Sequence, residues 1–346
     1  MKILHIADLH LGAKNSKLPK EKQDLLKDEM LDGCNRLFGK IGQDYDVALV
    51  CGDLFHNKSV PAKIVNNFFQ SIRKFGNPVL YVSGNHDEKV ILPDDVPENF
   101  VILNTENSVF SLGDFNFYCA ENLQSLDQTK NNVLLLHGNV ENTRDNDYVD
   151  INNFLKYGFD YIALGHIHQV KKYKKGEYVF AYPGSLFSNG FDECGDKGYI
   201  EVEIEDKQLK KCEFKPLNQR RYMICEYDIT QDNSNQEILA GVEEKFNQDG
   251  IRESDIVRLV LKGYYEESSD KSVAFLLNNL DSHFYIEIVD NSKLKIDIDK
   301  MKSETLSLKN EFISLVENSE LDENVKEKII SLGIEALKGE DLSIWN

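Results

Sequence analysis

Short apolar runs alternate with longer amphipathic stretches through the first half of the chain. The runs cover residues 2–6, 47–51, 78–82, 133–136 and 161–164. Each is short and largely free of polar residues, which is typical of strands buried on both faces of a sheet. Residues 20–41 and the stretch that begins at Pro61 instead space their apolar residues as a helix does. The pattern predicts an α/β sheet with helical cover.

After residue 165 the pattern changes to paired strands joined by short polar turns. The expected strands span residues 169–173, 178–182, 198–204 and 208–215. Such hairpins would complete a second sheet packed on the first. The expected fold class for this part is therefore α/β, built as a two-sheet β-sandwich flanked by helices.

A third pattern begins beyond a predicted hinge at residues 216–221. Strand and helix patterns then alternate, which predicts a smaller α/β domain. From about Ser303 onward, two amphipathic stretches predict terminal helices. The expected domains are residues 1–218, a capping domain at 219–300, and C-terminal helices at 301–346. These helices either dock a partner protein or pack on their own α/β domain.

Composition places the chain among ordinary globular proteins but adds one complication, its charge. No apolar run approaches the roughly 18 residues that cross a bilayer, so no membrane contact is expected. Six scattered cysteines without a CxxC pair predict reduced thiols and a cytoplasmic location. The formal net charge is −19. A protein that holds nucleic acid unaided usually presents a basic face, so the charge argues against unaided grip of a duplex.

Polar residues of metal-binding or acid/base type gather where the apolar runs end. They are Asp8, His10, Asp53, Asn85, His86, Asp87, His137, His166 and His168. Five of the eight histidines of the chain belong to this set, which weighs against random placement. Ligands of such sheets bind beyond the carboxyl ends of the strands, so we expect these side chains to converge there.

The residue types in these motifs favour a pair of cations. Asp8 and His10 are two positions apart and can face the same ion. A lone buried carboxylate at Asp53 would be costly, whereas one that bridges two cations would not be. Asn85 offers a neutral carbonyl oxygen. Mixed nitrogen and oxygen ligation suits Mn²⁺, Fe²⁺ or Zn²⁺ better than Ca²⁺ or Mg²⁺, and such a centre hydrolyses phosphate esters.

Each motif taken alone also has an ordinary structural interpretation. Gly-Asp after a strand is common in turns, and Asn-His-Asp can cap a helix. His5, inside an apolar run, is expected to be a core residue with its hydrogen bonds satisfied. His56 either lines the active site or lies in the loop after Asp53.

The ordered set resembles the calcineurin-like metallophosphoesterase superfamily, whose pattern is D-x-H, G-D, G-N-H-D/E, H and G-H-x-H. The similarity covers about residues 1–215 and is weak beyond them. Residues 8–12, 52–56 and 182–185, followed by 197–199, resemble the DNA-repair exonuclease branch of SbcD-type nuclease subunits. Residues 184–193 are similar to its shorter YhaO-like relatives.

The resemblance implies a role for each motif. One metal ion would be held by Asp8, His10, Asp53 and His168. The second would be held by Asp53, Asn85, His137 and His166. His86 would donate to the phosphate or protonate the leaving oxygen, with Asp87 orienting it. The two divalent ions are expected to be Mn²⁺, with Fe or Zn as alternatives.

The substrate expected from the resemblance is DNA. Phosphoprotein phosphatases of the superfamily carry an arginine shortly after Gly-Asp, and residues 53–58 contain none. A basic hairpin after the last motif would contact phosphates or would simply be a solvated tip; its lysines are Lys171, Lys172, Lys174 and Lys175.

The resemblance therefore implies a Mn-dependent DNA exonuclease and endonuclease subunit of an SbcCD-like repair and recombination complex. Its partners would be a coiled-coil ABC-type ATPase and a second copy of the chain. Two alternatives stay open. One is a phosphodiesterase for cyclic nucleotides or nucleotide sugars, and the other is a mainly architectural subunit.

Overall fold

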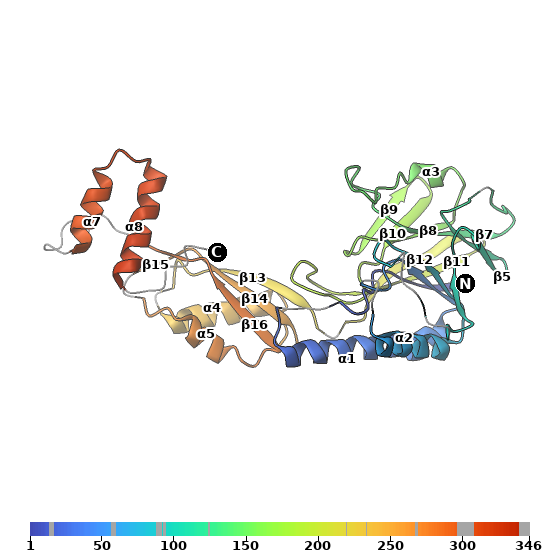
Figure 1. The fold of residues 1–346 in the computed structure, drawn as a ribbon, viewed down its shortest axis with the longest axis horizontal. Helices are drawn as coiled ribbons and strands as arrows, with labels where there is room; N and C mark the ends of the chain where they lie inside the picture. The colour runs from blue at the N-terminus through green and yellow to red at the C-terminus, as the bar shows by residue number, and fades with distance from the viewer. Residues whose placement is uncertain are drawn as a thin grey trace. The chain divides into compact units, whose positions relative to one another are not determined.

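The chain divides into two compact units, Met1–Tyr222 and Met223–Asn346, in a computed structural model (Figure 1). The structure describes residues 1–13, 17–56, 60–87, 92, 95–123, 125–218, 220–232, 234–266, 269–295 and 308–338. Within these ranges no helix is long and apolar enough to cross a membrane.

Two six-stranded sheets form the first unit. The first sheet has the order β12-β11-β1-β2-β3-β4, with bounds Gln208–Pro216, Gly198–Glu205, Lys2–Ile6, Val47–Cys51, Val79–Val82 and Phe100–Ile102. The second has the order β5-β6-β7-β8-β10-β9, with bounds Val109–Leu112, Phe115–Cys119, Asn131–His137, Tyr161–Gly165, Tyr178–Tyr182 and Lys171–Lys175. The two-sheet sandwich with flanking helices expected from the sequence is confirmed.

The hairpins are distributed differently from the expectation. β9 and β10 extend the second sheet, but β11 and β12 join the first, so the prediction that all four strands lie in the second sheet is wrong. β11 pairs antiparallel with β1, with Ile3 opposite Val202. Its alternation places Ile200, Val202 and Ile204 in the core between the sheets. A strand with alternating apolar and polar residues can extend either sheet, and the alternation does not indicate which sheet it joins.

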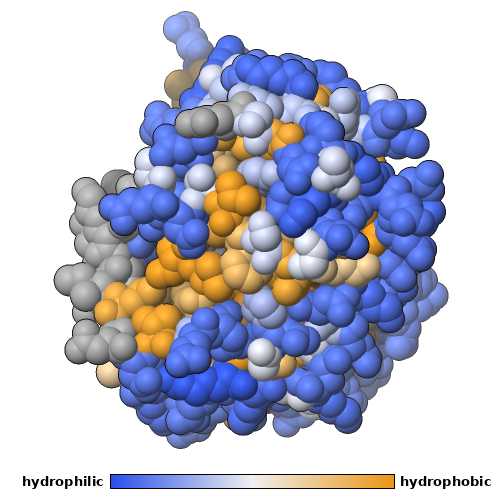
Figure 2. Space-filling model, turned by 90° about the vertical axis from the view of Figure 1, so that its right-hand side faces the viewer, coloured by the Kyte–Doolittle hydropathy of each residue, from blue (hydrophilic) through white to orange (hydrophobic). Residues whose placement is uncertain are grey.

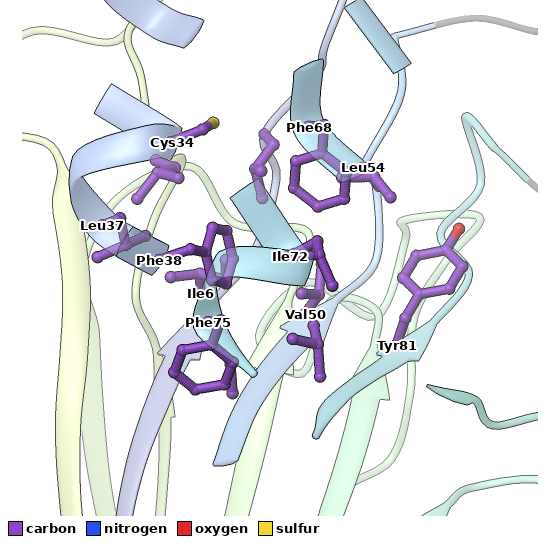
Figure 3. Close-up of a cluster of buried hydrophobic side chains, with 14 of the residues drawn as sticks. Ile6, Cys34, Leu37, Phe38, Val50, Leu54, Phe68, Ile72, Phe75 and Tyr81 are labelled. Carbon is purple, nitrogen blue, oxygen red and sulfur yellow. The ribbon is translucent and has the colours of Figure 1, made fainter. Parts of the chain in front are cut away.

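Three apolar layers hold the first unit together. The middle layer lies between the sheets, where β2 packs against β7 and β8. One outer layer lies under α1 (Lys20–Arg36), the π-helical turn η1 (Leu37–Ile41) and α2 (Ala62–Phe75). Figure 3 shows Phe38, Phe68 and Ile72 of this layer packed over the strands. The other outer layer lies on the second sheet near α3 (Asn152–Leu155). Strands covered on both faces need continuous apolar runs, which the sequence has.

Parallel pairing brings the motif-bearing strand ends together within each sheet. β1, β2 and β3 run parallel to one another, as do β7 and β8. The polar motifs after these strands therefore lie at the carboxyl edge of the sandwich. His5 lies deeper, in β1, where its ring nitrogens face the Tyr161 hydroxyl at 2.9 Å and the Leu164 carbonyl at 3.1 Å. The expectation of a satisfied core histidine is confirmed.

The second unit is a small α/β assembly. Its three-stranded sheet has the order β13-β14-β16, with bounds Tyr222–Asp228, Ile256–Lys262 and Tyr285–Asp290. α4 (Asn235–Gln248) and α5 (Val273–Asn279) contribute apolar residues to the core of this unit. β15 (Tyr264–Tyr265) and β17 (Lys293–Leu294) form a small second sheet. α7 (Leu308–Glu317) and α8 (Glu323–Lys338) follow as a helix pair.

The surface of the first unit is not uniformly polar. Figure 2 views the molecule from the right-hand side of Figure 1 and shows a band of hydrophobic residues across an otherwise hydrophilic face. Isolated apolar residues are normal on a protein surface, but a continuous band is a candidate contact surface.

Candidate metal centre

The loops at the carboxyl edge hold unusual backbone conformations. Asp8, His10, Asp53 and His166 have positive φ angles of 52°, 44°, 47° and 104°. Such conformations cost free energy in residues other than glycine, and they concentrate where a site requires a particular side-chain direction. The turns after β1, β2 and β8 thus aim these side chains at one region.

Asp53 lies at the centre of the cluster. Its carboxylate is buried, and its two oxygens face different histidines. Oδ2 lies 3.7 Å from Nε2 of His10, and Oδ1 lies 3.6 Å from Nε2 of His137. The geometry fits a carboxylate shared between two cation positions.

The first position is bordered by His10, His168 and Asp8. The Nε2 atoms of the two histidines lie 3.0 Å apart. Burial, followed by the nearby charge of His168, lowers the pKa of His10 to about 4. The ring of His10 is therefore neutral at pH 7 and has a lone pair available to a cation. Suitable ligand atoms of Asp8, His10 and His168 lie within 4.8 Å of one another.

The second position is bordered by Asn85, His137 and Asp53. Nε2 of His137 lies 3.1 Å from Oδ1 of Asn85. The other ring nitrogen, Nδ1, is 3.0 Å from the carbonyl of Cys51, so it donates a hydrogen bond there and leaves Nε2 unprotonated. The ring of His166 stands perpendicular to that of His137, with centroids 5.3 Å apart. Its Nε2 lies 3.5 Å from Oδ2 of Asp145, and ligand atoms of His166, Asp145 and Asp147 lie within 4.8 Å of one another.

Buried polar atoms support the presence of cations here. Asp8 is 0% exposed, and burial raises its pKa. Nδ1 of His10 is buried and has no hydrogen-bond partner among the described residues. Bringing carboxylates and neutral imidazoles together without a cation leaves them poorly stabilised, whereas divalent ions of the Mn²⁺, Fe²⁺ or Zn²⁺ type match this donor set.

His86 and His56 form the open side of the cluster. The His86 side chain is 42% exposed, and its Nε2 lies 4.0 Å from Oδ2 of Asp53. Its Nδ1 faces the backbone carbonyl of His56 at 3.0 Å, and the two rings stack at 5.7 Å. His56 therefore lies at the cluster and holds His86 through its backbone.

Asp87 is buried beside the cluster and bonds to two of its loops. Its carboxylate accepts hydrogen bonds from the backbone amides of Gly84, Leu54 and Phe55, at 2.7, 2.6 and 3.3 Å. These contacts join the loop after β3 to the loop after β2. The carboxylate is thus used by the backbone of both loops, and an orienting effect of Asp87 on the His86 ring stays a prediction.

The lysines of the predicted basic hairpin lie on β9, and most already have partners. Lys171 pairs with Glu141, Lys172 donates to the carbonyl of Cys212, and Lys175 donates to Asn152. Lys174 is exposed. The contribution of the hairpin to substrate binding stays a prediction.

Sequence reasoning missed a group of buried polar residues behind His168. Glu193, Ser185 and Lys197 are 6%, 0% and 3% exposed. Oε1 of Glu193 lies 2.7 Å from Nδ1 of His168. The stretch that contains Ser185 and Glu193 was recognised only as a family resemblance. Glu193 is not part of any spaced motif of metal-binding residues, so the sequence alone does not mark it as functional.

Comparisons with known proteins agree with the geometry. Residues 1–170, which contain all seven predicted ligands, match the family model for calcineurin-like phosphoesterases. The chain is 26% identical over 291 residues to the uncharacterized metallophosphoesterase YhaO of Bacillus subtilis (strain 168), covering 75% of this chain and 71% of that protein. It is 24% identical over 336 residues to the DNA double-strand break repair protein Mre11 of Methanocaldococcus jannaschii, covering 88% of each. The protein therefore contains a calcineurin-like metallophosphoesterase domain, with homologues among YhaO and Mre11-type DNA repair proteins.

Proposed function

We propose that this protein, a metal-dependent phosphoesterase by its calcineurin-like domain, is a nuclease subunit that hydrolyses phosphodiester bonds in DNA. The observation that carries the proposal is the placement of Asp53. One carboxylate oxygen lies 3.7 Å from Nε2 of His10 and the other lies 3.6 Å from Nε2 of His137. This arrangement supports a two-metal centre, and Mn²⁺ suits its mixed ligands.

The ligands of the two ions would be divided as the sequence predicts. Asp8, His10 and His168 would hold the first ion, and Asn85, His137 and His166 would hold the second, with Asp53 shared. Ions bound there would supply a nucleophilic water at neutral pH and would neutralise charge on the phosphoryl group.

His86 is the residue placed to act on the substrate. Its backbone amide donates to Oδ1 of Asp53 at 3.0 Å, which fixes its position relative to the shared carboxylate. Its imidazole is exposed at the rim of the cluster. We propose that it donates a proton to the leaving oxygen or a hydrogen bond to the phosphate.

The choice of DNA rests on the relatives and on one missing residue. The names of the Mre11 relatives state a role in double-strand break repair. No arginine follows Asp53 in residues 53–58, which argues against a phosphatase that binds phosphomonoesters through such an arginine. The net charge of −19 and the paired lysines of β9 favour the alternative, a phosphodiesterase for cyclic nucleotides or nucleotide sugars.

One assay separates these substrates. Full-length protein with Mn²⁺ is incubated with single-stranded DNA, with duplex DNA that has free ends, and with a cyclic dinucleotide. The proposal expects DNA cleavage that requires metal and is lost in an Asp8→Asn variant. Hydrolysis of the cyclic dinucleotide alone would establish the alternative, and no hydrolysis of any diester by metal-loaded protein would refute both.

We propose that α7 and α8 dock a coiled-coil ABC-type ATPase that supplies much of the DNA grip. One side of the pair buries Ile313, Val316 and Ile330 with Leu294 of its own unit. The pair also forms an apolar groove of about 410 Å³ lined in part by Leu308 and Leu315. These two leucines are 70% and 74% exposed. The pair therefore packs on its own unit and still presents an apolar surface.

Point variants test the docking proposal without truncation. Leu315→Glu should abolish binding to the purified ATPase while hydrolysis of a small diester persists. Leu321→Glu is the matched control, because Leu321 is 47% exposed and does not line the groove. Equal ATPase binding by both variants would contradict the proposal.

We also propose a homodimer. The hydrophobic band of Figure 2 is a candidate surface for it, since continuous apolar patches mark association sites. Sedimentation equilibrium of the purified chain measures the state directly. A monomer at micromolar concentration would refute the dimer.

A further inference from the structure

A buried carboxylate outside the predicted ligand set lies directly behind one metal ligand. Glu193 belongs to the loop between β10 and β11 and is 6% exposed. We propose that Glu193 is a positioning residue that sets the tautomer and direction of the His168 imidazole for metal binding. The inference rests on the proposed metal centre, and it does not depend on which diester is cleaved.

The contact between the two side chains defines which nitrogen carries hydrogen. Oε1 of Glu193 lies 2.7 Å from Nδ1 of His168. A carboxylate can only accept hydrogen bonds, so Nδ1 is the protonated nitrogen. In the neutral ring the lone pair is then on Nε2, which is the atom 3.0 Å from Nε2 of His10. Glu193 therefore directs the donor atom of His168 toward the first cation position.

Glu193 is itself held in place. Its second oxygen accepts a hydrogen bond from the hydroxyl of Ser185 at 2.8 Å, and it lies 3.8 Å from Nζ of Lys197. Lys197 in turn donates to the backbone carbonyl of His168 at 2.7 Å. The group thus fixes both the ring and the backbone of His168.

The surroundings of Glu193 suit an anionic carboxylate. It faces three donors, which are Nδ1 of His168, the hydroxyl of Ser185 and the ammonium of Lys197. An anionic acceptor makes the imidazole more basic and hence a better metal ligand. A buried lysine compensates the charge, so the carboxylate can remain ionised without solvent.

A second ligand in the same site is fixed by a neutral acceptor. His137 donates from Nδ1 to the carbonyl of Cys51 at 3.0 Å and presents Nε2 to the second position. Both histidines therefore use Nδ1 for orientation. Nδ1 of His137 has a carboxylate, that of Asp8, only at 3.8 Å. Nδ1 of His168 has one at hydrogen-bond distance, and Glu193 can be substituted without changing a predicted ligand.

Metal affinity of the full-length chain tests the inference. Mn²⁺ binding is measured by isothermal titration calorimetry for wild type, Glu193→Ala, Glu193→Gln and Asp192→Asn. Loss of a carboxylate that hydrogen-bonds to a metal-binding histidine weakens metal binding by about 10- to 100-fold. We expect a decrease of this size for Glu193→Ala. Glu193→Gln should fall in between, because its amide oxygen still accepts from Nδ1. Asp192 is the adjacent exposed carboxylate and its variant should bind as wild type.

Histidine ¹⁵N NMR of the wild-type metal-free protein reads the protonated nitrogen of His168 with Glu193 intact. The His168 signals, assigned by their loss in a His168→Gln spectrum, should show a hydrogen on Nδ1. A neutral ring protonated on Nε2 alone, or wild-type Mn²⁺ affinity in a folded Glu193→Ala variant, would overturn the inference. Wild-type protein that binds no Mn²⁺ would instead refute the proposed function, so the two failures are distinguishable.

Discussion

A methyl group built on Gly84 would lie 2.1 Å from Oδ1 of Asp53 and 2.5 Å from the Asp53 backbone nitrogen. Cβ atoms in proteins essentially never come within 3.0 Å of another group. The loop after β3 can therefore approach the predicted shared carboxylate only because residue 84 has no side chain. The glycine before Asn85 is a packing requirement of the site.

Gly84→Ala should disrupt metal binding. The added Cβ pushes Asp53 out of its position, and we expect Mn²⁺ affinity to fall about 10-fold or more. Calorimetric titration with Mn²⁺ measures the change. Gly39→Ala is the control, since its Cβ would meet nothing closer than Lys74 Cδ at 3.7 Å. Equal affinity in both variants would show that the contact has no bearing on the site.

His86→Ala should separate metal binding from turnover. The His86 imidazole is not in the predicted ligand set, so the variant should retain both ions. Loss of a general acid costs about 10²- to 10⁴-fold in rate. Metal content and DNA cleavage are measured on the same preparation, with His283→Ala as a control outside the site. A variant with full metal content and wild-type rate would rule out the role of His86.

Asp87→Ala should destabilise the first unit. The carboxylate is 4% exposed and accepts from three backbone amides, which the variant leaves without a partner. An unsatisfied buried group costs about 1–3 kcal/mol, so we expect a loss of about 2–4 kcal/mol in the free energy of unfolding. Urea unfolding followed by circular dichroism measures it.

Asp95→Ala provides the comparison for Asp87. The Asp95 side chain is 92% exposed and pairs with Arg73, and exposed pairs contribute less than about 1 kcal/mol. If Asp87→Ala cost no more than Asp95→Ala, the bridge between the two loops would be unimportant for stability.

His5 should make stability depend on pH in the weakly acid range. Burial lowers the pKa of His5 from 6.5 to about 3, although the hydrogen bond to Leu164 raises it slightly. Below pH 6.5 the unfolded chain binds a proton that the folded chain does not, so stability falls as pH falls toward 3. This group alone accounts for a loss of about 2 kcal/mol between about pH 7 and pH 5.

A His5→Asn variant tests the pH effect. Its free energy of unfolding should fall less over the same pH interval than that of wild type, by about the contribution of the lost imidazole. Urea unfolding at both pH values measures the difference. The same pH-dependent loss in variant and wild type would contradict the assignment of the low pKa to His5.

Strand ends and their motifs were predictable because burial on both faces leaves a clear apolar run. The sheet to which β11 belongs was not predictable, because its alternating pattern fits either sheet. Only its pairing with β1 determines which sheet it joins. β4 was missed because it has only three residues, whereas Ser111 interrupts the apolar run of β5 and Asn116 that of β6. For the site, residue types and strand ends identified the cluster that the structure brings together. Glu193 was not found, because a residue that acts through another side chain follows no spacing rule. The backbone hydrogen bonds of Asp87 are likewise invisible in sequence, and its effect on the His86 ring stays a prediction.

Counting metal ions in an Asp53 variant tests the central claim most directly. Mn²⁺ binding to wild type, Asp53→Ala and the surface control Asp192→Asn is followed by calorimetry and by electron paramagnetic resonance. If Asp53 is shared, wild type and control bind two ions, and the single substitution weakens both sites together. Retention of one site at wild-type affinity in Asp53→Ala would contradict a carboxylate shared by two metals.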